Sequence, residues 1–174
     1  AGCGAVKIEW FPGCEKVASA IGKAKIPVMG HVGLTPQRAS ELGGLKLQGK
    51  EAQAAGAIIR QAKLLEKAGC FSIVLECIPA QVAAMITKNL RIPTIGIGAG
   101  ANCDGQVLVT YDLLGLFTRF HPKFVKQYVN LSDEIKKAVG QFFSEVKTGK
   151  FPDAEHSFSM DPQELKKVKV GGHT

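Results

Sequence analysis

Three titratable side chains stand at the ends of three short apolar segments of this chain. Glu9 ends Ala-Val-Lys-Ile-Glu, His31 ends Pro-Val-Met-Gly-His, and Glu76 ends Ser-Ile-Val-Leu-Glu. Carboxylate and imidazole groups can transfer protons, and carboxylates can hold hard cations. Buried parallel strands read as continuous apolar runs, and barrels of alternating strands and helices carry their chemistry where the strands end. The pattern therefore predicts an active-site rim, and so an enzyme.

Two further features extend this predicted rim. Lys7 lies two residues before Glu9, so on a strand both side chains face the same side. In the functional interpretation Glu9 holds a divalent cation such as magnesium and Lys7 binds an anionic group of the substrate; a structural salt bridge between them is the alternative. A fourth apolar segment ends at Gly98. Its glycines predict a close approach by a ligand or by backbone at the barrel mouth, rather than a dinucleotide site.

Each of the other candidate residues also has a structural alternative. His31 can be an ordinary buried histidine, and Glu76 can be a solvent-facing acid that opens the next helix. In the functional interpretation, a partly dry position at the end of an apolar strand makes Glu76 a useful general base. Cys77 follows Glu76, and packing is the favoured interpretation of its thiol.

The bulk properties exclude several classes of protein. A chain of 174 residues is ordinarily one domain. Its five cysteines form no Cys-x-x-Cys pair, so neither a disulfide framework nor a zinc site is expected. The net charge of +7 is spread along helical segments, which predicts a solvated surface that attracts small anions rather than a nucleic-acid site. Neither a membrane-length apolar run nor a secretory signal is evident, so we expect a cytoplasmic protein without membrane contact.

Hydrophobic periodicity predicts the elements that position these groups. The loop over 32–49 is long and glycine-rich, which is typical of functional loops. Five strands are predicted, whereas a closed (β/α)8 barrel has eight, and an open doubly wound sheet needs helices on both faces; the periodicity leaves both open. The expected strands are one ending at Glu9, 28–31, 71–76, 94–98 and 105–110, and the expected helices are 13–24, 50–68, one opened by Pro79, and one that starts at Ser132 and is closed by Gly149.

Several motifs in order along the chain resemble the ketopantoate hydroxymethyltransferase (3-methyl-2-oxobutanoate hydroxymethyltransferase) family. The resemblance covers residues 1 to about 158. It is carried by Val-Lys-Ile-Glu9, Gly30-His-Val-Gly-Leu-Thr-Pro-Gln37, Gln48-Gly49, Val-Leu-Glu76-Cys-Ile-Pro79, Ile-Gly-Ile-Gly-Ala-Gly100, Asp104-Gly-Gln-Val-Leu-Val109, Pro122-Lys-Phe124 and Glu155-His-Ser-Phe158.

This resemblance implies an α/β fold, a (β/α)8 TIM barrel of the phosphoenolpyruvate/pyruvate-binding type. The chain resembles an incomplete barrel, from about the fourth strand to the eighth, over 1–158, and 159–174 is expected to be a loosely ordered tail. The implied reaction transfers a hydroxymethyl group from 5,10-methylenetetrahydrofolate to α-ketoisovalerate and gives ketopantoate for pantothenate and coenzyme A biosynthesis. The implied cofactor is magnesium, and the implied assembly is a homodecamer.

By resemblance, Glu9 is a magnesium ligand, Lys7 and His31 contact the keto acid, and Glu76 is the general base. No residue is assigned to the folate. The family's first strands carry a serine and two further acidic residues of the site and have no counterpart here, so we expect the chain by itself to be inactive. Trp10 also stands where the family has glycine. The alternatives are another magnesium-dependent keto-acid lyase barrel, or a non-catalytic barrel fragment that binds anions or a partner.

Overall fold

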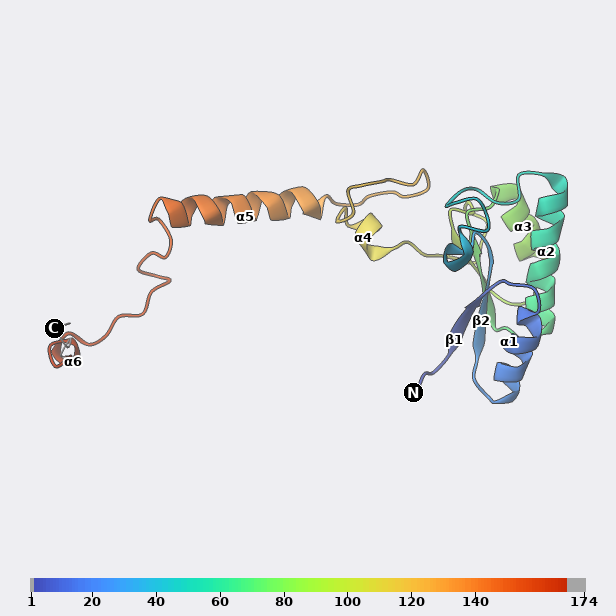
Figure 1. Ribbon diagram of the computed structural model, residues 1–174, viewed down its shortest axis with the longest axis horizontal. Helices are drawn as coiled ribbons and strands as arrows, with labels where there is room; N and C mark the ends of the chain where they lie inside the picture. Colours follow the sequence, from blue (N-terminus) through green and yellow to red (C-terminus); the bar gives the residue numbers. More distant parts are fainter. Residues whose placement is uncertain (1, 169–174) are drawn as a thin grey trace.

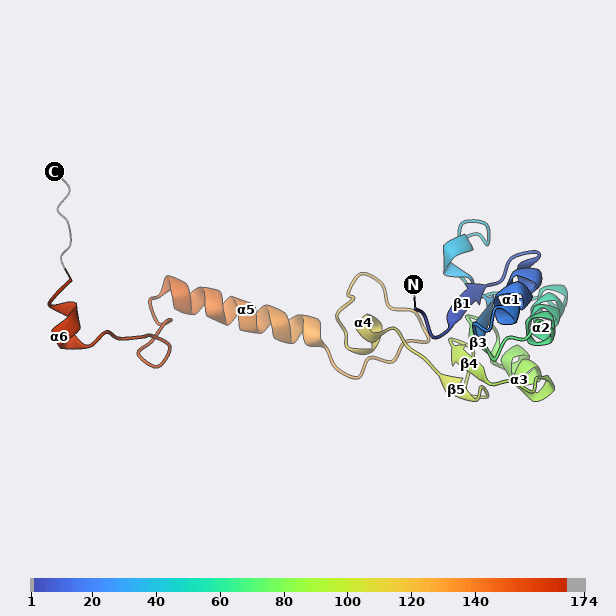
Figure 2. The ribbon, with the colours of Figure 1, turned by 90° about the horizontal axis from the view of Figure 1, so that it is seen from below.

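A computed structural model describes residues 2–168 of the chain. Its centre is a sheet of five parallel strands whose order in space, β1-β2-β3-β4-β5, is their order in the sequence. Three helices pack on one face of this sheet (Figures 1 and 2). The strands are β1 (Val6–Glu9), β2 (Val28–Gly33), β3 (Ser72–Glu76), β4 (Thr94–Ile97) and β5 (Gly105–Gln106), and the helices are α1 (Cys14–Lys23), α2 (Ala52–Lys67) and α3 (Ala80–Asn89).

The core lies between the sheet and these three helices. On α2 the apolar residues Ile58, Ala62 and Leu65 recur at helical spacing and are buried. Leu65 is fully buried, which contributes roughly 1.5–3 kcal/mol to stability. It lies against Gly30 of β2, where an added Cβ would come within 2.9 Å of Leu65 Cδ1. The glycine thus lets helix and sheet approach closely.

The opposite face of the sheet carries the predicted site residues. Alternate strand residues such as Ile8, Ile73 and Leu75 belong to the helix-covered core. Because side chains alternate across a strand, their neighbours lie on the other face. In a (β/α)8 barrel that face is the interior, whereas a doubly wound sheet has helices on both faces. Sequential strand order with helices on a single face, within residues 2–168, fits part of a barrel. The residues on this second face include Lys7, Glu9, His31, Val74 and Glu76.

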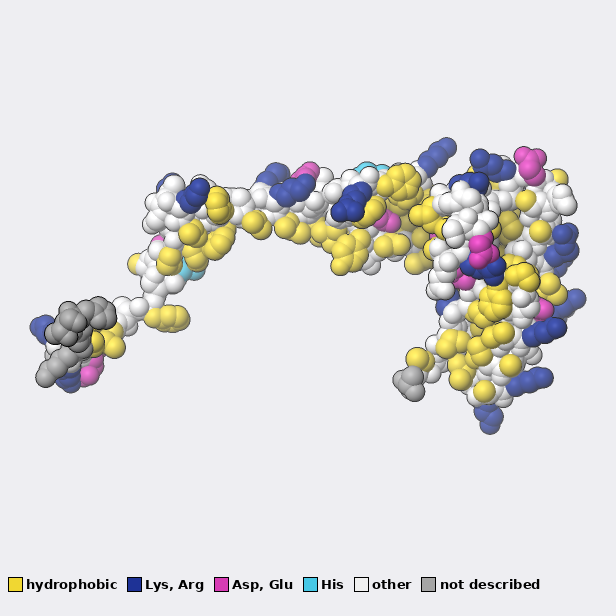
Figure 3. Space-filling view, in the orientation of Figure 1, with side chains coloured by type: hydrophobic (Ala, Val, Ile, Leu, Met, Phe, Trp, Pro, Cys, Tyr) yellow, Lys and Arg dark blue, Asp and Glu magenta, His cyan; other side chains and the backbone are white. Residues whose placement is uncertain are grey.

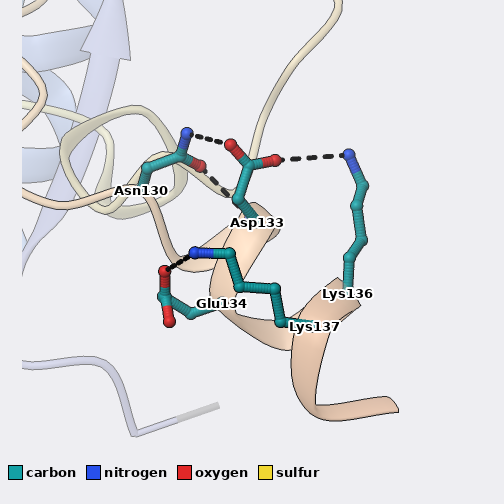
Figure 4. A network of polar contacts seen from close by, with 5 residues as sticks. All are labelled: Asn130, Asp133, Glu134, Lys136 and Lys137. Atoms are coloured by element: carbon teal, nitrogen blue, oxygen red, sulfur yellow. Dashed lines mark hydrogen bonds and ion pairs between the residues drawn. The ribbon is translucent and has the colours of Figure 1, made fainter. Parts of the chain in front are cut away.

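After β5 the chain leaves the sheet and runs outward as an extended arm (Figure 1). The arm contains the short α4 (Thr110–Leu113), the long α5 (Leu131–Lys147) and the short α6 (Pro162–Leu165). Asn130 caps α5, because its side chain accepts a hydrogen bond of 3.3 Å from the Asp133 backbone N–H (Figure 4). The expected apolar stripe of α5 is exposed, and yellow side chains line this arm in Figure 3. The large apolar residues of α5 that are 48–60% exposed are Ile135, Val139, Phe142, Phe143 and Val146.

The predicted elements differ from the structure mainly at the fifth strand. It was expected over 105–110, but β5 ends at Gln106 and α4 begins at Thr110. β5 has one neighbour, the four-residue β4, so the ladder has little length over which to continue. β2 runs two residues beyond His31, to Gly33. The division at 158 stays a prediction; α6 lies in the expected tail, and 169–174 lie outside the described residues.

No helix within residues 2–168 combines the length and the apolar character that a bilayer crossing requires.

Candidate active site

The carboxyl ends of three neighbouring strands bring Glu9, His31 and Glu76 together. Glu9 is the register partner of His31 in the β1–β2 pair, and Glu76 pairs with Gly33, two residues beyond His31, in the β2–β3 pair. The imidazole therefore lies between two carboxylates. Its Nδ1 is 3.8 Å from Glu9 Oε1, and its Nε2 is 3.3 Å from Glu76 Oε2. The juxtaposition is the one that the strand-end pattern predicts, while the roles of these residues stay predictions.

His31 is fully buried, yet neither ring nitrogen has a hydrogen-bond partner among the described residues. Leaving a buried polar group unpaired costs about 1–3 kcal/mol, so such groups are rare in proteins and often belong to functional sites. An imidazole between two acids can accept a proton from one side or donate one to the other. This geometry favours the functional interpretation of His31 over that of an ordinary core histidine.

Glu9 faces a cavity of about 310 Å³ that Lys7, Phe11 and Arg38 also line. The Glu9 carboxylate is 15% exposed, and its Oε2 accepts a hydrogen bond of 3.2 Å from the Gln37 backbone N–H. No ion pair joins Lys7 to Glu9 in the described part of the chain, so the salt-bridge alternative finds no support there. With Lys7 and Arg38 on its walls, the cavity can attract a small anion such as a carboxylate.

The backbone around Glu76 is fixed by the neighbouring segments. The Glu76 carbonyl accepts a hydrogen bond of 2.9 Å from Leu34 N–H, and the Cys77 carbonyl accepts one of 2.8 Å from Gln48 N–H. Cys77 itself has a φ of 46°, a left-handed conformation that non-glycine residues adopt where the surrounding structure imposes it. The Glu76 side chain, 17% exposed, thus sits on a rigid support.

The thiol of Cys77 is partly buried beside this site. Burial, together with the smaller effect of the negative charge of Glu76, raises the pKa of Cys77 to about 11. A thiol with such a pKa is protonated near neutral pH and is a poor nucleophile. The structure therefore favours the packing interpretation of Cys77.

The glycines after β4 make room for side chains of the chain itself. An added Cβ at Gly98, whose φ is +63°, would lie 2.7 Å from the Phe124 ring, and one at Gly100 would lie 2.4 Å from Ala80 Cβ. The sequence predicts a ligand or backbone close to these glycines, whereas the structure places the side chains of Phe124 and Ala80 there. As expected, no helix begins here, since the chain bends and enters β5.

Two groups of the site, the Arg38 side chain and the Gln37 backbone amide, are not indicated by any local pattern. Both belong to the segment around η1 (Pro36–Arg38), which folds back over the end of β1. The only sequence signal was the length and glycine content of the 32–49 loop. The side chains that a long loop places depend on its tertiary contacts, which periodicity does not report.

A magnesium ion would find one carboxylate of this chain suited to it. Among residues 2–168 no three His, Cys, Asp or Glu side chains group closely enough to hold a metal. Magnesium in proteins is often held by one or two carboxylates, with water and substrate oxygens completing its shell. Glu9 fits this pattern as a single ligand, because its Oε1 accepts no hydrogen bond from the described residues.

Together, these features define a parallel α/β protein whose sheet is compatible with part of a barrel, with an acid–imidazole–acid row at the carboxyl ends of its strands. Residues 1–154 match the family described as ketopantoate hydroxymethyltransferase. The chain belongs to this family.

Curated relatives agree with the family match. Proteins named 3-methyl-2-oxobutanoate hydroxymethyltransferase from Oleidesulfovibrio alaskensis and Clostridium botulinum are 56% and 53% identical to it over 166 and 167 residues. These alignments cover 95% and 96% of this chain, but 57% and 61% of the relatives. A relative of the same name from Enterococcus faecalis is 54% identical over 155 residues, 89% of this chain and 56% of the relative. The chain thus spans about three fifths of the length of the relatives it matches.

Proposed function

We propose that the protein to which this chain belongs transfers a hydroxymethyl group from 5,10-methylenetetrahydrofolate to α-ketoisovalerate and forms ketopantoate, a step of pantothenate and coenzyme A biosynthesis. The observation that carries this proposal is the buried His31 between Glu9 and Glu76, next to a cavity that Lys7 lines. The name of the relatives, 3-methyl-2-oxobutanoate hydroxymethyltransferase, supports the same acceptor and the same group.

Glu76 is the proposed general base. Its carboxylate takes the proton from the carbon next to the keto group of α-ketoisovalerate, and the electron pair of that C–H bond moves toward the keto oxygen as an enolate. The enolate carbon then forms a C–C bond to the one-carbon unit, and both C–N bonds that joined this unit to the donor break. Water supplies the hydroxyl group of the product, and tetrahydrofolate leaves with its two nitrogens reprotonated by the substrate proton and by the remaining proton of that water. Acid–base catalysis of this kind typically contributes about 10²–10⁴-fold to the rate.

The remaining residues bind and orient. Lys7, on the wall of the cavity beside Glu9, attracts the substrate carboxylate. His31, 3.3 Å from Glu76 Oε2, holds that carboxylate in place and can carry its proton away. A magnesium ion, when bound with Glu9 as one ligand, supplies Lewis-acid polarisation of the keto oxygen, which makes the adjacent C–H bond more acidic.

The complete fold in this proposal is a (β/α)8 barrel of the phosphoenolpyruvate/pyruvate-binding type, in which β1 to β5 are the fourth to the eighth strand and 1–158 belong to the catalytic domain. The helix-free face of the sheet supports it, because that face is the interior of a barrel. The exposed apolar stripe of α5 supports assembly into a homo-oligomer, for which we propose a decamer in the cytoplasm.

The proposal is tested by measuring ketopantoate formation by the whole protein from α-ketoisovalerate and methylenetetrahydrofolate. Turnover that depends on both substrates supports it. Aldol cleavage of a carboxylated keto acid, without use of the folate, would favour the lyase barrel instead. Absence of turnover with every substrate, together with anion binding, would favour a non-catalytic protein.

A further inference from the structure

The segment that leaves β2 is hydrogen-bonded to the ends of both neighbouring strands. At its start, the Leu34 N–H donates a hydrogen bond of 2.9 Å to the Glu76 carbonyl at the end of β3. Three residues later, the Gln37 N–H donates one of 3.2 Å to Glu9 Oε2 at the end of β1. A single short stretch of backbone therefore links the two acids that lie on either side of His31.

The turn that presents this backbone amide to Glu9 is itself well fixed. Thr35 is buried, and Pro36 takes the first position of η1, where its restricted φ suits a helical turn. The Arg38 N–H closes the turn with a hydrogen bond of 2.9 Å to the Thr35 carbonyl. The far end of the loop returns to β3, where the Gln48 N–H donates to the Cys77 carbonyl at 2.8 Å. The loop is thus anchored on β3 at both ends.

The Gln37 amide is the group that orients the Glu9 carboxylate. Among residues 2–168, Glu9 accepts one hydrogen bond, the one from the Gln37 N–H to Oε2, while its Oε1 lies 3.8 Å from His31 Nδ1. The Arg38 guanidinium is engaged elsewhere, because its Nε donates a hydrogen bond of 3.0 Å to Glu41 Oε2. A neutral N–H holds one carboxylate oxygen and leaves the negative charge of Glu9 unpaired by a cation.

This arrangement matches what a metal-binding carboxylate needs. Ligating carboxylates are usually hydrogen-bonded in turn by outer groups, which fix their orientation. Without such a bond, a glutamate must give up the freedom of its side-chain torsions when it binds an ion. The bond to Oε2 removes part of this cost in advance, and Oε1 keeps its lone pairs for an ion.

We propose that the backbone amide of Gln37 is a positioning group that holds Glu9 ready for a divalent cation. The inference rests on the proposed function, in which Glu9 is a magnesium ligand. The amide acts through Glu9 and contacts neither the ion nor the substrate. Because the same segment is bonded to the Glu76 backbone, the loop also fixes the metal-binding acid relative to the general base.

The N–H can be removed by itself when Gln37 is replaced with lactic acid, which puts an ester oxygen in place of the nitrogen. The matched control is Gln37→Ala, which has the same methyl side chain and keeps the N–H. Both are made in the whole protein, and the Kd for Mn²⁺ is measured without substrates from the electron paramagnetic resonance of the free ion. We expect the ester to raise this Kd about tenfold relative to Gln37→Ala, the low end of the range for outer partners of metal ligands. Gln37→Ala should stay within twofold of wild type.

Two further measurements separate positioning from damage to the fold. An ester at Gln53, in the first turn of α2, where N–H groups have no partner within the helix, should leave the Mn²⁺ affinity unchanged. At saturating magnesium, the kcat of the Gln37 ester should recover to within threefold of wild type, because the lost bond acts through metal affinity.

Three outcomes would overturn the inference: equal Mn²⁺ affinity in the Gln37 ester and Gln37→Ala, a kcat of the ester that stays low at saturating magnesium, or no Mn²⁺ binding by the wild-type protein. Failure of the proposed function looks different. If the ester weakens Mn²⁺ binding as expected but the wild-type protein forms no ketopantoate, the positioning role is supported and the proposed reaction is removed.

Discussion

At the scale of single residues, the account depends on an imidazole held between two carboxylates. Glu9, His31 and Glu76 could be predicted from the sequence because each ends an apolar run, and parallel strands place their ends at one edge. The position of Arg38, on the wall of the cavity beside Glu9, could not be predicted, because a long loop places it through contacts distant in sequence.

The role of His31 as a positioning residue predicts a measurable loss of turnover. In the whole protein, His31→Asn removes the contact with Glu76 Oε2 but keeps a polar side chain. We expect kcat to fall about 10–100-fold, as is typical when a group that orients another is lost, and the pH dependence of kcat to shift. His121→Asn, at an exposed histidine of the arm, is the control. A kcat within twofold of wild type, with an unchanged pH profile, would show that His31 orients nothing.

The cysteines predict an order of chemical reactivity. Burial raises the pKa of Cys70 and Cys77 to about 11, so near pH 8 only about one thiol in a thousand is ionised at each. Alkylation by iodoacetamide at pH 8, followed by peptide mass spectrometry, should modify the exposed Cys3 first. The rates at Cys70 and Cys77 should rise about tenfold per pH unit between pH 8 and 10. Labelling of Cys77 as fast as Cys3 at pH 8 would contradict this account, and labelling in denaturant controls for peptide recovery.

At the scale of elements, the helices over the sheet follow their sequence pattern within two residues, because burial against the sheet and the periodicity of apolar residues coincide. The expected 50–68 helix is α2 (Ala52–Lys67), for example. The prediction of the fifth strand is wrong beyond Gln106. The length of an edge strand depends on the length of the strand it pairs with, and not on its own apolar content. Periodicity also could not predict that the apolar stripe on α5 is exposed. An apolar stripe indicates that a helix face can be buried, but not which surface buries it.

The close packing of α2 on β2 predicts the cost of one added methyl group. In Gly30→Ala the new Cβ would lie 2.9 Å from Leu65 Cδ1 and 3.5 Å from Cys70 Sγ. We expect the free energy of unfolding to fall by about 1–3 kcal/mol, as for other overpacked cores. Urea unfolding followed by circular dichroism measures this change. Gly22→Ala in α1, where an added Cβ meets nothing within 4 Å, should instead leave stability unchanged or raise it by about 0.5–1 kcal/mol. Equal effects of both substitutions would contradict the packing described.

At the scale of the whole molecule, the sheet has helices on one face and its site residues on the other. The relatives are longer than the part that matches this chain, which covers 57–61% of the first two. In a closed barrel, further strands would complete the wall around the face that carries Lys7 and Glu9. Family membership and the site geometry are thus observations on this chain, whereas the complete reaction is proposed for the whole protein.

This arrangement predicts that the purified 174-residue chain does not form ketopantoate, even though Glu9, His31 and Glu76 are in place. Among the described residues Lys7 is exposed, and no three His, Cys, Asp or Glu side chains group closely enough to hold a metal. Product formation is followed by mass spectrometry, and the whole protein under the same conditions is the control. Steady ketopantoate formation by the chain alone would show that these residues suffice.

The central claim is that Glu76 removes the proton next to the keto group, and isotope exchange measures this step directly. The whole protein is incubated with α-ketoisovalerate in D2O without the folate donor, and loss of the C3 proton signal is followed by NMR. The account predicts enzyme-dependent exchange that slows at least about 100-fold in Glu76→Gln and is unchanged in Glu155→Gln, at an exposed glutamate of the arm. Exchange at the wild-type rate in Glu76→Gln would contradict it.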